Sequence, residues 1–170
     1  MNKSDKILIQ VISILMIAFC LSCGRGSGFS DIPAIQFESL SKDTMVQGRL
    51  LEDSLTLVFS FRDGDGNLGT GAQGLRENII LTDNRNGEVY TTYKVPDLPP
   101  SGAAGGIEGS ILLKLYTECC IFPPLDSIPA CSSVPTLYPS NQFTVSIRLN
   151  DDDGNESNVV ESSLITILCN

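Results

Sequence analysis

Strict alternation of apolar and polar side chains is the feature of this chain that most constrains its fold. In residues 55–62 (LTLVFSFR) every odd position is large and apolar, and residues 143–149 (FTVSIRL) repeat the pattern. A period of two places such side chains on one face of a β-strand, so each segment predicts a strand with one buried face. Because the chain after about residue 33 shows no convincing helical period, the pattern predicts an all-β protein.

Other strand-like segments bring the expected number of strands to about seven. They are residues 34–40, 78–85, 88–95, 107–117 and 159–169. Asn86-Gly87 separates two of these segments and is a strong hairpin signal, because both residues tolerate a positive φ. About seven short strands in a chain of 170 residues predict a single antiparallel sandwich, immunoglobulin-like or fibronectin III-like, over residues 33–170.

The first 22 residues have the organisation of an export signal. Two lysines precede an apolar run over residues 7–21, which is too short to span a bilayer as a helix. The run ends in CLSCG (residues 20–24), which resembles a bacterial lipobox. The resemblance implies a lipoprotein signal peptide over residues 1–22, removed by cleavage, and a membrane anchor of acyl chains such as palmitate on Cys23. Residues 23–32 would then be the lipidated cysteine and a flexible tether, the alternatives being an uncleaved anchor or simple secretion.

The end of the chain and its lipobox together resemble small immunoglobulin-like lipoproteins of the bacterial envelope. Residues 153–160 (DGNESNVV) and 164–167 (LITI) resemble the last hairpin of bacterial immunoglobulin-like repeats, and FRDGDG at residues 61–66 adds to the likeness. The chain departs from a true immunoglobulin domain because it has no tryptophan and no cysteine pair between the strands at Leu57 and Val145. The resemblance implies a fold and a place in the cell envelope, but no activity. Since no aspartate follows the lipobox cysteine, it favours the outer membrane, with either face open.

Two acidic turns follow the two most strongly alternating segments. Residues 63–67 (DGDGN) align with residues 151–155 (DDDGN). In an immunoglobulin-like sandwich these two strands run in the same direction on opposite sheets, so the loops that follow them emerge at the same end. The sequence therefore predicts a cluster of carboxylates at one end of the domain.

Such a cluster suggests a cation site, because close carboxylates repel one another unless water separates them, protons neutralise them or a cation bridges them. Calcium accepts carboxylate, amide and backbone oxygens. A structural calcium would take its ligands from Asp63, Asp65, Asn67, Asp151, Asp153 and Asn155. The alternative is a pair of solvated turns, since Asp, Asn and Gly are also ordinary turn residues.

Four cysteines follow the lipobox, and an even number in an exported chain predicts two disulfides. They are Cys119, Cys120, Cys131 and Cys169. A bond between the two adjacent cysteines is disfavoured because neighbouring strand side chains point to opposite faces. Continuing the alternation of residues 111–115 places Cys119 toward the core, which favours Cys119–Cys169 with Cys120–Cys131. The swapped pairing is the alternative, and either would tie down a proline-rich segment over residues 121–141.

The amino-acid composition excludes several kinds of catalytic site and disfavours some partners. A chain without histidine cannot build Ser-His-Asp, Cys-His or histidine-ligated zinc sites, and a net charge of −9 disfavours nucleic acid as a partner. Without tryptophan, sugar binding would rest on Tyr90, Tyr93, Tyr116 and Tyr138. The sequence thus predicts a non-enzymatic interaction or structural module of the envelope, lipid-tethered to the membrane, whose partner is an envelope protein or a glycan. The alternative is a glycan-binding surface lipoprotein with structural calcium.

Overall fold

The computed structural model of the chain describes residues 28–69, 77–96 and 106–170. The predicted signal peptide over residues 1–22 and the predicted lipidation site, Cys23, lie outside the described residues. In these three ranges, no helix has the length and apolar character needed to cross a membrane.

One layer of the fold is a three-stranded antiparallel sheet with the order β1-β3-β6. It contains β1 (Ala34–Leu40), β3 (Ser54–Asp63) and β6 (Ile107–Tyr116). The central strand β3 is the segment with the strictest alternation, and it pairs with β6 without interruption from Ser54↔Tyr116 to Asp63↔Ile107. Apolar side chains at alternate positions of β3 all point to one side, which is the buried face of the sheet.

The second layer is built from two hydrogen-bonded sheets, and two stretches of chain run from one sheet into the other. One has the order β5-β4-β8-β9 and the other β2-β10-β7. Thr144 alone separates β7 from β8, and residues 162–164 separate β9 from β10, so each ladder continues into the next. The strands are β2 (Thr44–Val46), β4 (Ile79–Asp83), β5 (Val89–Tyr93), β7 (Ser140–Phe143), β8 (Val145–Leu149), β9 (Val160–Glu161) and β10 (Ile165–Leu168).

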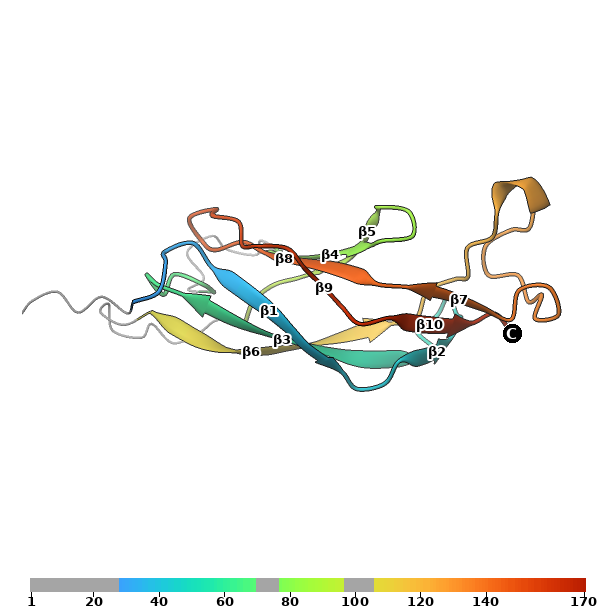
Figure 1. The fold of residues 1–170 in the computed structure, drawn as a ribbon, viewed down its shortest axis with the longest axis horizontal. Helices are drawn as coiled ribbons and strands as arrows, with labels where there is room; N and C mark the ends of the chain where they lie inside the picture. Colours follow the sequence, from blue (N-terminus) through green and yellow to red (C-terminus); the bar gives the residue numbers. More distant parts are fainter. Residues whose placement is uncertain (1–27, 70–76, 97–105) are drawn as a thin grey trace, which may run out of the picture.

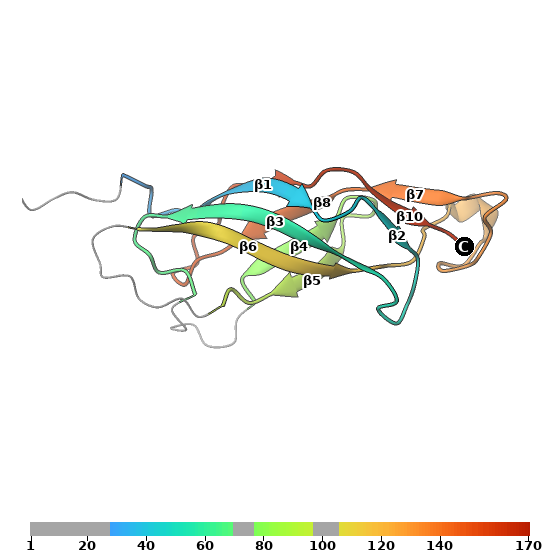
Figure 2. The same cartoon turned by 90° about the horizontal axis from the view of Figure 1, so that it is seen from below.

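The two layers face each other as an antiparallel β-sandwich (Figures 1 and 2), which confirms the predicted fold class. The sheets β1-β3-β6 and β5-β4-β8-β9 follow the strand order expected for an immunoglobulin-like arrangement. The described residues form ten strands where about seven were expected, because two long strands are each interrupted and β2 is additional. β2 pairs with β10 in parallel and is the exception to the antiparallel rule.

The core lies between the layers and consists of the inward-facing side chains of both. Its completely buried members include Leu57 and Phe59 from one sheet and Leu81, Ile147 and Ile167 from the other. A side-chain amide also links the layers, because Asn158 accepts from the backbone N–H of Ile35 and donates to its carbonyl oxygen. Only the layering of two apolar faces buries such alternating strands, which is why the sequence pattern predicted a sandwich.

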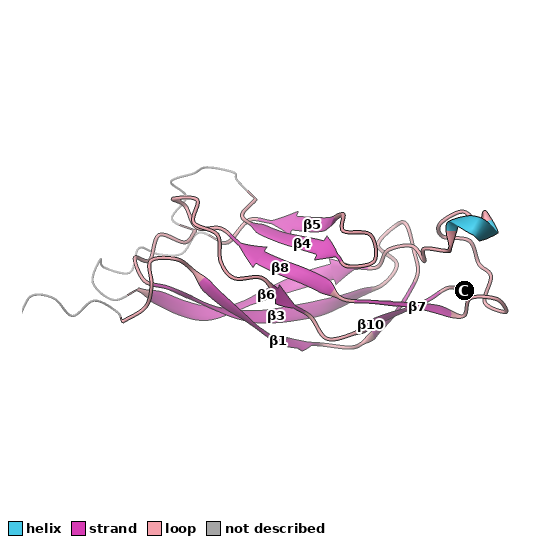
Figure 3. Cartoon of the chain, turned by 45° about the horizontal axis from the view of Figure 1, so that its top comes forward, coloured by secondary structure: helices cyan, strands magenta, loops and turns pink. Residues whose placement is uncertain are grey.

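The long axis of the sandwich gives the molecule two distinct ends, as Figure 3 also shows. At one end, here called the acidic end, lie the segment that leads into β1 and the loops that follow β3 and β8. The opposite end, here called the cysteine end, holds the chain terminus and the segment 119–139 with its short 3-10 helix η1 (Pro124–Asp126). Loop 47–53 also belongs to the cysteine end, because Gln47 Nε2 donates to the carbonyl oxygen of Ser132.

Two disulfides close the cysteine end, and the preferred prediction of their pairing was wrong. The bonds are Cys119–Cys131 and Cys120–Cys169, with Cα–Cα distances of 4.5 and 5.8 Å. The prediction extended the alternation of β6 to Cys119, but β6 ends at Tyr116. Beyond it the burial pattern shifts by one residue, so Cys120 is buried and Cys119 is only half-buried. The swapped pairing, which the sequence left open, is the one observed.

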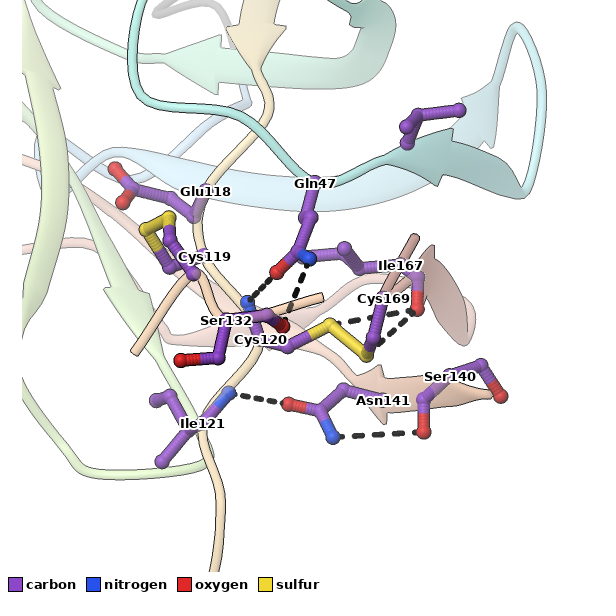
Figure 4. Close-up of a disulfide and its surroundings, with 12 residues drawn as sticks. Gln47, Glu118, Cys119, Cys120, Ile121, Ser132, Ser140, Asn141, Ile167 and Cys169 are labelled. Carbon is purple, nitrogen blue, oxygen red and sulfur yellow. Dashed lines mark hydrogen bonds between the residues drawn. A yellow bond between two sulfur atoms is a disulfide. The ribbon is translucent and has the colours of Figure 1, made fainter. Parts of the chain in front are cut away.

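Side-chain amides hold the backbone around the buried disulfide (Figure 4). Gln47 Oε1 accepts from the N–H of Cys120, and Asn141 Oδ1 accepts from the N–H of Ile121. The segment 119–139 is thus tied by hydrogen bonds to loop 47–53 and to β7, and by the Cys120–Cys169 disulfide to the residue that follows β10. The expectation that disulfides tie down the proline-rich segment over residues 121–141 is therefore confirmed.

Candidate functional site

The acidic end brings the two predicted turns together. β3 and β8 end side by side, and their loops are joined by Asn67, whose Nδ2 donates to Asp65 Oδ2 and to Asp153 Oδ2, each at 3.0 Å. The hydrogen bond to Asp153 spans 86 positions of sequence. The expectation that both loops emerge at one end is confirmed by this contact.

The second loop is held in its own closed turn. Asp151 accepts from Asn155 twice, at 2.7 Å from the backbone N–H to Oδ1 and at 2.7 Å from Nδ2 to Oδ2. Gly154 has φ of +91°, which its position in the turn requires and which a residue with a Cβ would adopt only with strain. Asp151 and Asn155 are therefore partnered within the turn, while Asp153 is exposed at its tip.

Asp63 occupies the innermost position of the cluster. It keeps the inward parity of β3, and its exposed fraction is 0%. Leu68 covers this end of the core and is itself fully buried. Among the described residues, neither Asp63 carboxylate oxygen accepts a hydrogen bond of good geometry, and the same holds for Asn67 Oδ1. Buried oxygens without partners are rare in folded proteins because losing water without a replacement is costly.

The surroundings of Asp63 make its negative charge unfavourable. Burial, followed by the nearby charges of Asp65 and Asp151, raises the pKa of its carboxyl group from 3.8 to about 6. The backbone N–H groups of Leu68 and Asn67 act in the opposite direction and lower this pKa by a smaller amount. The carboxyl group of Asp63 is therefore poised to take a proton or a cation.

The segment that leads into the domain packs against the first acidic loop. The N–H of Gly64 donates to the carbonyl oxygen of Ser30 at 2.8 Å. The guanidinium of Arg62 lies over the ring of Phe29 at 5.5 Å from its centroid. A Cβ on Gly64 would come within 2.6 Å of the carbonyl oxygens of Phe29 and Ser30, so glycine is required by the close approach of the two backbones.

The acidic end thus offers oxygen ligands from three kinds of group: carboxylate, side-chain amide and backbone. Among the described residues, no three Asp, Glu, Cys or His side chains converge closely enough to hold a metal ion on their own. Of the six predicted ligands, Asp65, Asn67 and Asp153 are directly joined, Asp63 lies beneath them, and Asp151 is paired with Asn155. Any cation held here would need amide, backbone or water oxygens besides the carboxylates.

A pocket that sequence analysis did not locate lies beside the cysteine end. It has a volume of about 400 Å³ and is bordered by the edge strands β5 and β6 and by loop 47–53. Three of the four tyrosines line it, together with polar and charged side chains. The lining includes Arg49, Tyr90, Tyr93, Tyr116, Thr117 and Glu118. Only the packing of the two sheets brings these residues together, and no local motif marks them.

The tyrosines close the open side of the sandwich between its two sheets. The hydroxyl of Tyr93 donates to the carbonyl oxygen of Lys114 at 2.6 Å, and that of Tyr90 donates to the carbonyl oxygen of Tyr116. The ring of Tyr90 stacks on Phe143 with 6.0 Å between centroids. Tyr138 lies apart, on Phe122 in the segment 119–139. Three of the predicted sugar-stacking residues therefore meet, and Tyr138 does not join them.

No protein-family model matches the chain, and no curated protein matches its sequence significantly.

Proposed function

We propose that this protein is a non-enzymatic lipoprotein of the bacterial envelope, a β-sandwich module that holds a partner at a distance from the membrane. The support for the anchor is the lipobox-like sequence CLSCG at residues 20–24. In this proposal acyl chains, palmitate among them, on Cys23 hold the protein in the outer membrane, since several chains together bind a bilayer far more firmly than one.

The observation that carries the proposal is the position of the two ends of the molecule. The described chain begins at residue 28 at the acidic end, and the segment 119–139 lies at the opposite end (Figure 1). A lipid anchor on Cys23, a few residues before the segment 28–32 that packs on the first acidic loop, would therefore hold the acidic end near the membrane and point the cysteine end away from it.

The cysteine end also presents exposed apolar side chains on a covalently fixed surface. Leu125 is 97% exposed and Leu50 is 83% exposed, and Leu51, Ile121 and Leu137 of the same end are exposed as well. We call these five residues the distal surface. Large apolar side chains exposed on a rigid part of a protein are typical of contact with another protein. The proposal therefore assigns partner binding to the distal surface.

The anchor is tested by growing cells with a radiolabelled or clickable palmitate analogue and separating proteins between detergent and aqueous phases. We expect the wild type and Cys20→Ala to be labelled and to enter the detergent phase, and Cys23→Ala to do neither. Labelling of Cys23→Ala, or an unlabelled wild type, would exclude the anchor. Density-gradient separation of the two membranes then tests the outer-membrane assignment.

The distal surface is tested with variants that change exposed leucines. Cross-linking in intact cells should trap the same envelope protein with the wild type and with Leu112→Ser, a matched control because Leu112 is 67% exposed on β6. The double variant Leu125→Ser/Leu137→Ser should lose that adduct. An adduct that survives in the double variant, or that Leu112→Ser also removes, would argue against partner binding at the distal surface.

The tyrosine-lined pocket favours a second candidate, glycan binding, because sugars stack on aromatic rings and need polar groups beside them. Here the test is a glycan array read with the wild type, Tyr116→Ala and the distal double variant. Signal that Tyr116→Ala removes and the distal double variant keeps would favour a glycan ligand over a protein partner. Absence of any signal from the wild type would set this candidate aside.

A further inference from the structure

We infer that the acidic end is a calcium site, formed by the loop after β3 and the loop after β8 around the buried carboxylate of Asp63. The inference is independent of the lipid anchor and of the distal surface, because it rests only on the geometry of these two loops. It favours a bound cation over solvated turns, the two alternatives that the sequence left open.

The first argument is the burial of a charged group without a partner. Asp63 is 0% exposed, and within the described part of the chain neither of its carboxylate oxygens accepts a hydrogen bond of good geometry, although the backbone N–H groups of Leu68 and Asn67 act on it. A solvated turn would leave this carboxylate in water, as the turn leaves Asp65 and Asp153. Asp63 instead points inward along the parity of β3, where only a proton or a cation can neutralise it.

A second acceptor beside Asp63 also lacks a donor. Asn67 Oδ1 is buried without a hydrogen-bond partner in the described residues, while Nδ2 of the same amide lies between Asp65 and Asp153. The amide nitrogen brings a positive partial charge between the two carboxylates, and a bound cation would reduce their repulsion more strongly. Two carboxylates drawn to one positive group, next to unpaired oxygens, are the surroundings expected of a cation-binding loop pair.

The donor set selects calcium among common cations. The chain has no histidine, and Cys119, Cys120, Cys131 and Cys169 are paired in disulfides at the opposite end. The acidic end therefore offers only oxygen ligands, which hard cations prefer. Calcium accepts an irregular shell of six to eight oxygens, including water, whereas magnesium requires near-ideal octahedral geometry. Two loops from different sheets, with only some of the carboxylates converging, fit the irregular shell.

In the proposed site Asp63 supplies the inner carboxylate and Asn67 Oδ1 the amide ligand. Asp65, Asp151 and Asp153 add carboxylate oxygens or bind through water, and Asn155 keeps Asp151 oriented through its two hydrogen bonds. The cation would link strands β3 and β8, which belong to different sheets. Calcium should therefore stabilise the whole sandwich and not only the loops.

The experiment uses the full-length protein purified in detergent and measures calcium binding by calorimetric titration, with thermal melting in calcium and in chelator. We expect a saturable heat and a higher melting temperature in calcium. Asp63→Asn removes the inner charge without changing its shape, and Asp153→Asn lies on the exposed tip where folding is not at risk. Each should weaken calcium binding by roughly tenfold or more, while Asp126→Asn at the cysteine end should bind as the wild type does.

Three results would overturn the calcium site. They are an unchanged melting temperature with no binding heat, unaltered calcium affinity in both Asp63→Asn and Asp153→Asn, and equal stabilisation by the same concentration of magnesium. Because none of these measurements depends on Cys23 or the distal surface, failure here would leave the proposed function standing, and failure of that proposal would leave the calcium site standing.

Discussion

Asn67, in the loop after β3, donates a hydrogen bond from Nδ2 to Oδ2 of Asp153, in the loop after β8, at 3.0 Å. This contact joins the two acidic turns across the end of the sandwich. It also places three polar side chains, counting Asp65, above the buried carboxylate of Asp63. The energetic coupling of the two loops can therefore be measured through this pair.

A double-mutant cycle should detect that coupling. In chelator, Asn67→Ala and Asp153→Ala together should destabilise the protein by about 0.5–1.5 kcal/mol less than the sum of the single variants, as for other hydrogen bonds. The measurement is urea unfolding of all four proteins. The control pairs Asp153→Ala with Asn86→Ala in the β4–β5 turn, where the effects should add. A coupling energy indistinguishable from that of the control pair would contradict the contact.

The elevated pKa of Asp63 makes the stability of the metal-free protein depend on pH. Its carboxyl group titrates at about 6 when folded, against an ordinary value of 3.8. Between these values the folded state holds a proton that the unfolded state has released, so stability falls as pH rises through this window. The loss amounts to roughly 2–3 kcal/mol by a pH of about 7.5.

Asp63→Asn should abolish this dependence, because the amide does not titrate. The measurement compares urea unfolding of the wild type and Asp63→Asn in chelator at several pH values. The difference between their unfolding free energies should change steadily between about pH 4 and about pH 6, with the variant gaining on the wild type. Other carboxyl groups titrate alike in both proteins and cancel in the difference. A constant difference across that range would refute the raised pKa.

The fold was predictable because its signal is local. Alternation in residues 55–62 fixed which face of β3 is buried, and the boundaries of β1 were predicted at residues 34–40 as observed. β2 was missed, since a three-residue strand has no periodicity and exists through its parallel pairing with β10. The strand breaks at Thr144 and at residues 162–164 were also missed.

For the candidate sites, the sequence predicted only those features that follow from the directions of the strands. The parallel directions of β3 and β8 predicted that the acidic turns lie together, but the complete burial of Asp63 depends on tertiary packing, which no local motif records. The tyrosine-lined pocket needs the edges of β5 and β6 to lie together, which is a property of tertiary structure. The prediction that Cys119 faces the core was wrong because the alternation of buried and exposed side chains ends where strand β6 ends.

The two disulfides should differ in what they contribute to stability. Cys120 and Cys169 are fully buried and 49 residues apart, whereas Cys119 and Cys131 are separated by only 12. Chain entropy assigns roughly 4 kcal/mol to the longer loop and roughly 3 kcal/mol to the shorter one. Replacing Cys120 and Cys169 with alanine also leaves buried space.

Urea unfolding of the two double-alanine variants measures this difference. Cys120→Ala/Cys169→Ala should be the less stable of the two, and Cys119→Ala/Cys131→Ala should retain a cooperative transition while segment 119–139 becomes more sensitive to protease. The wild type provides the reference for both. Equal losses, or a larger loss from the Cys119–Cys131 pair, would show that the ranking by loop length and burial is wrong.

The packing of residues 28–32 on the acidic end rests on the absence of a side chain at Gly64. Gly64→Ala would place a Cβ within 2.6 Å of two backbone carbonyl oxygens, those of Phe29 and Ser30, which cannot be relieved by a side-chain rotation. We expect a loss of about 1–3 kcal/mol in urea unfolding and faster chymotrypsin cleavage after Phe29. Gly109→Ala is the matched control, since its Cβ would meet only the ring of Phe61, at 3.3 Å. If both variants unfold and cleave alike, the leading segment does not dock on the loop after β3.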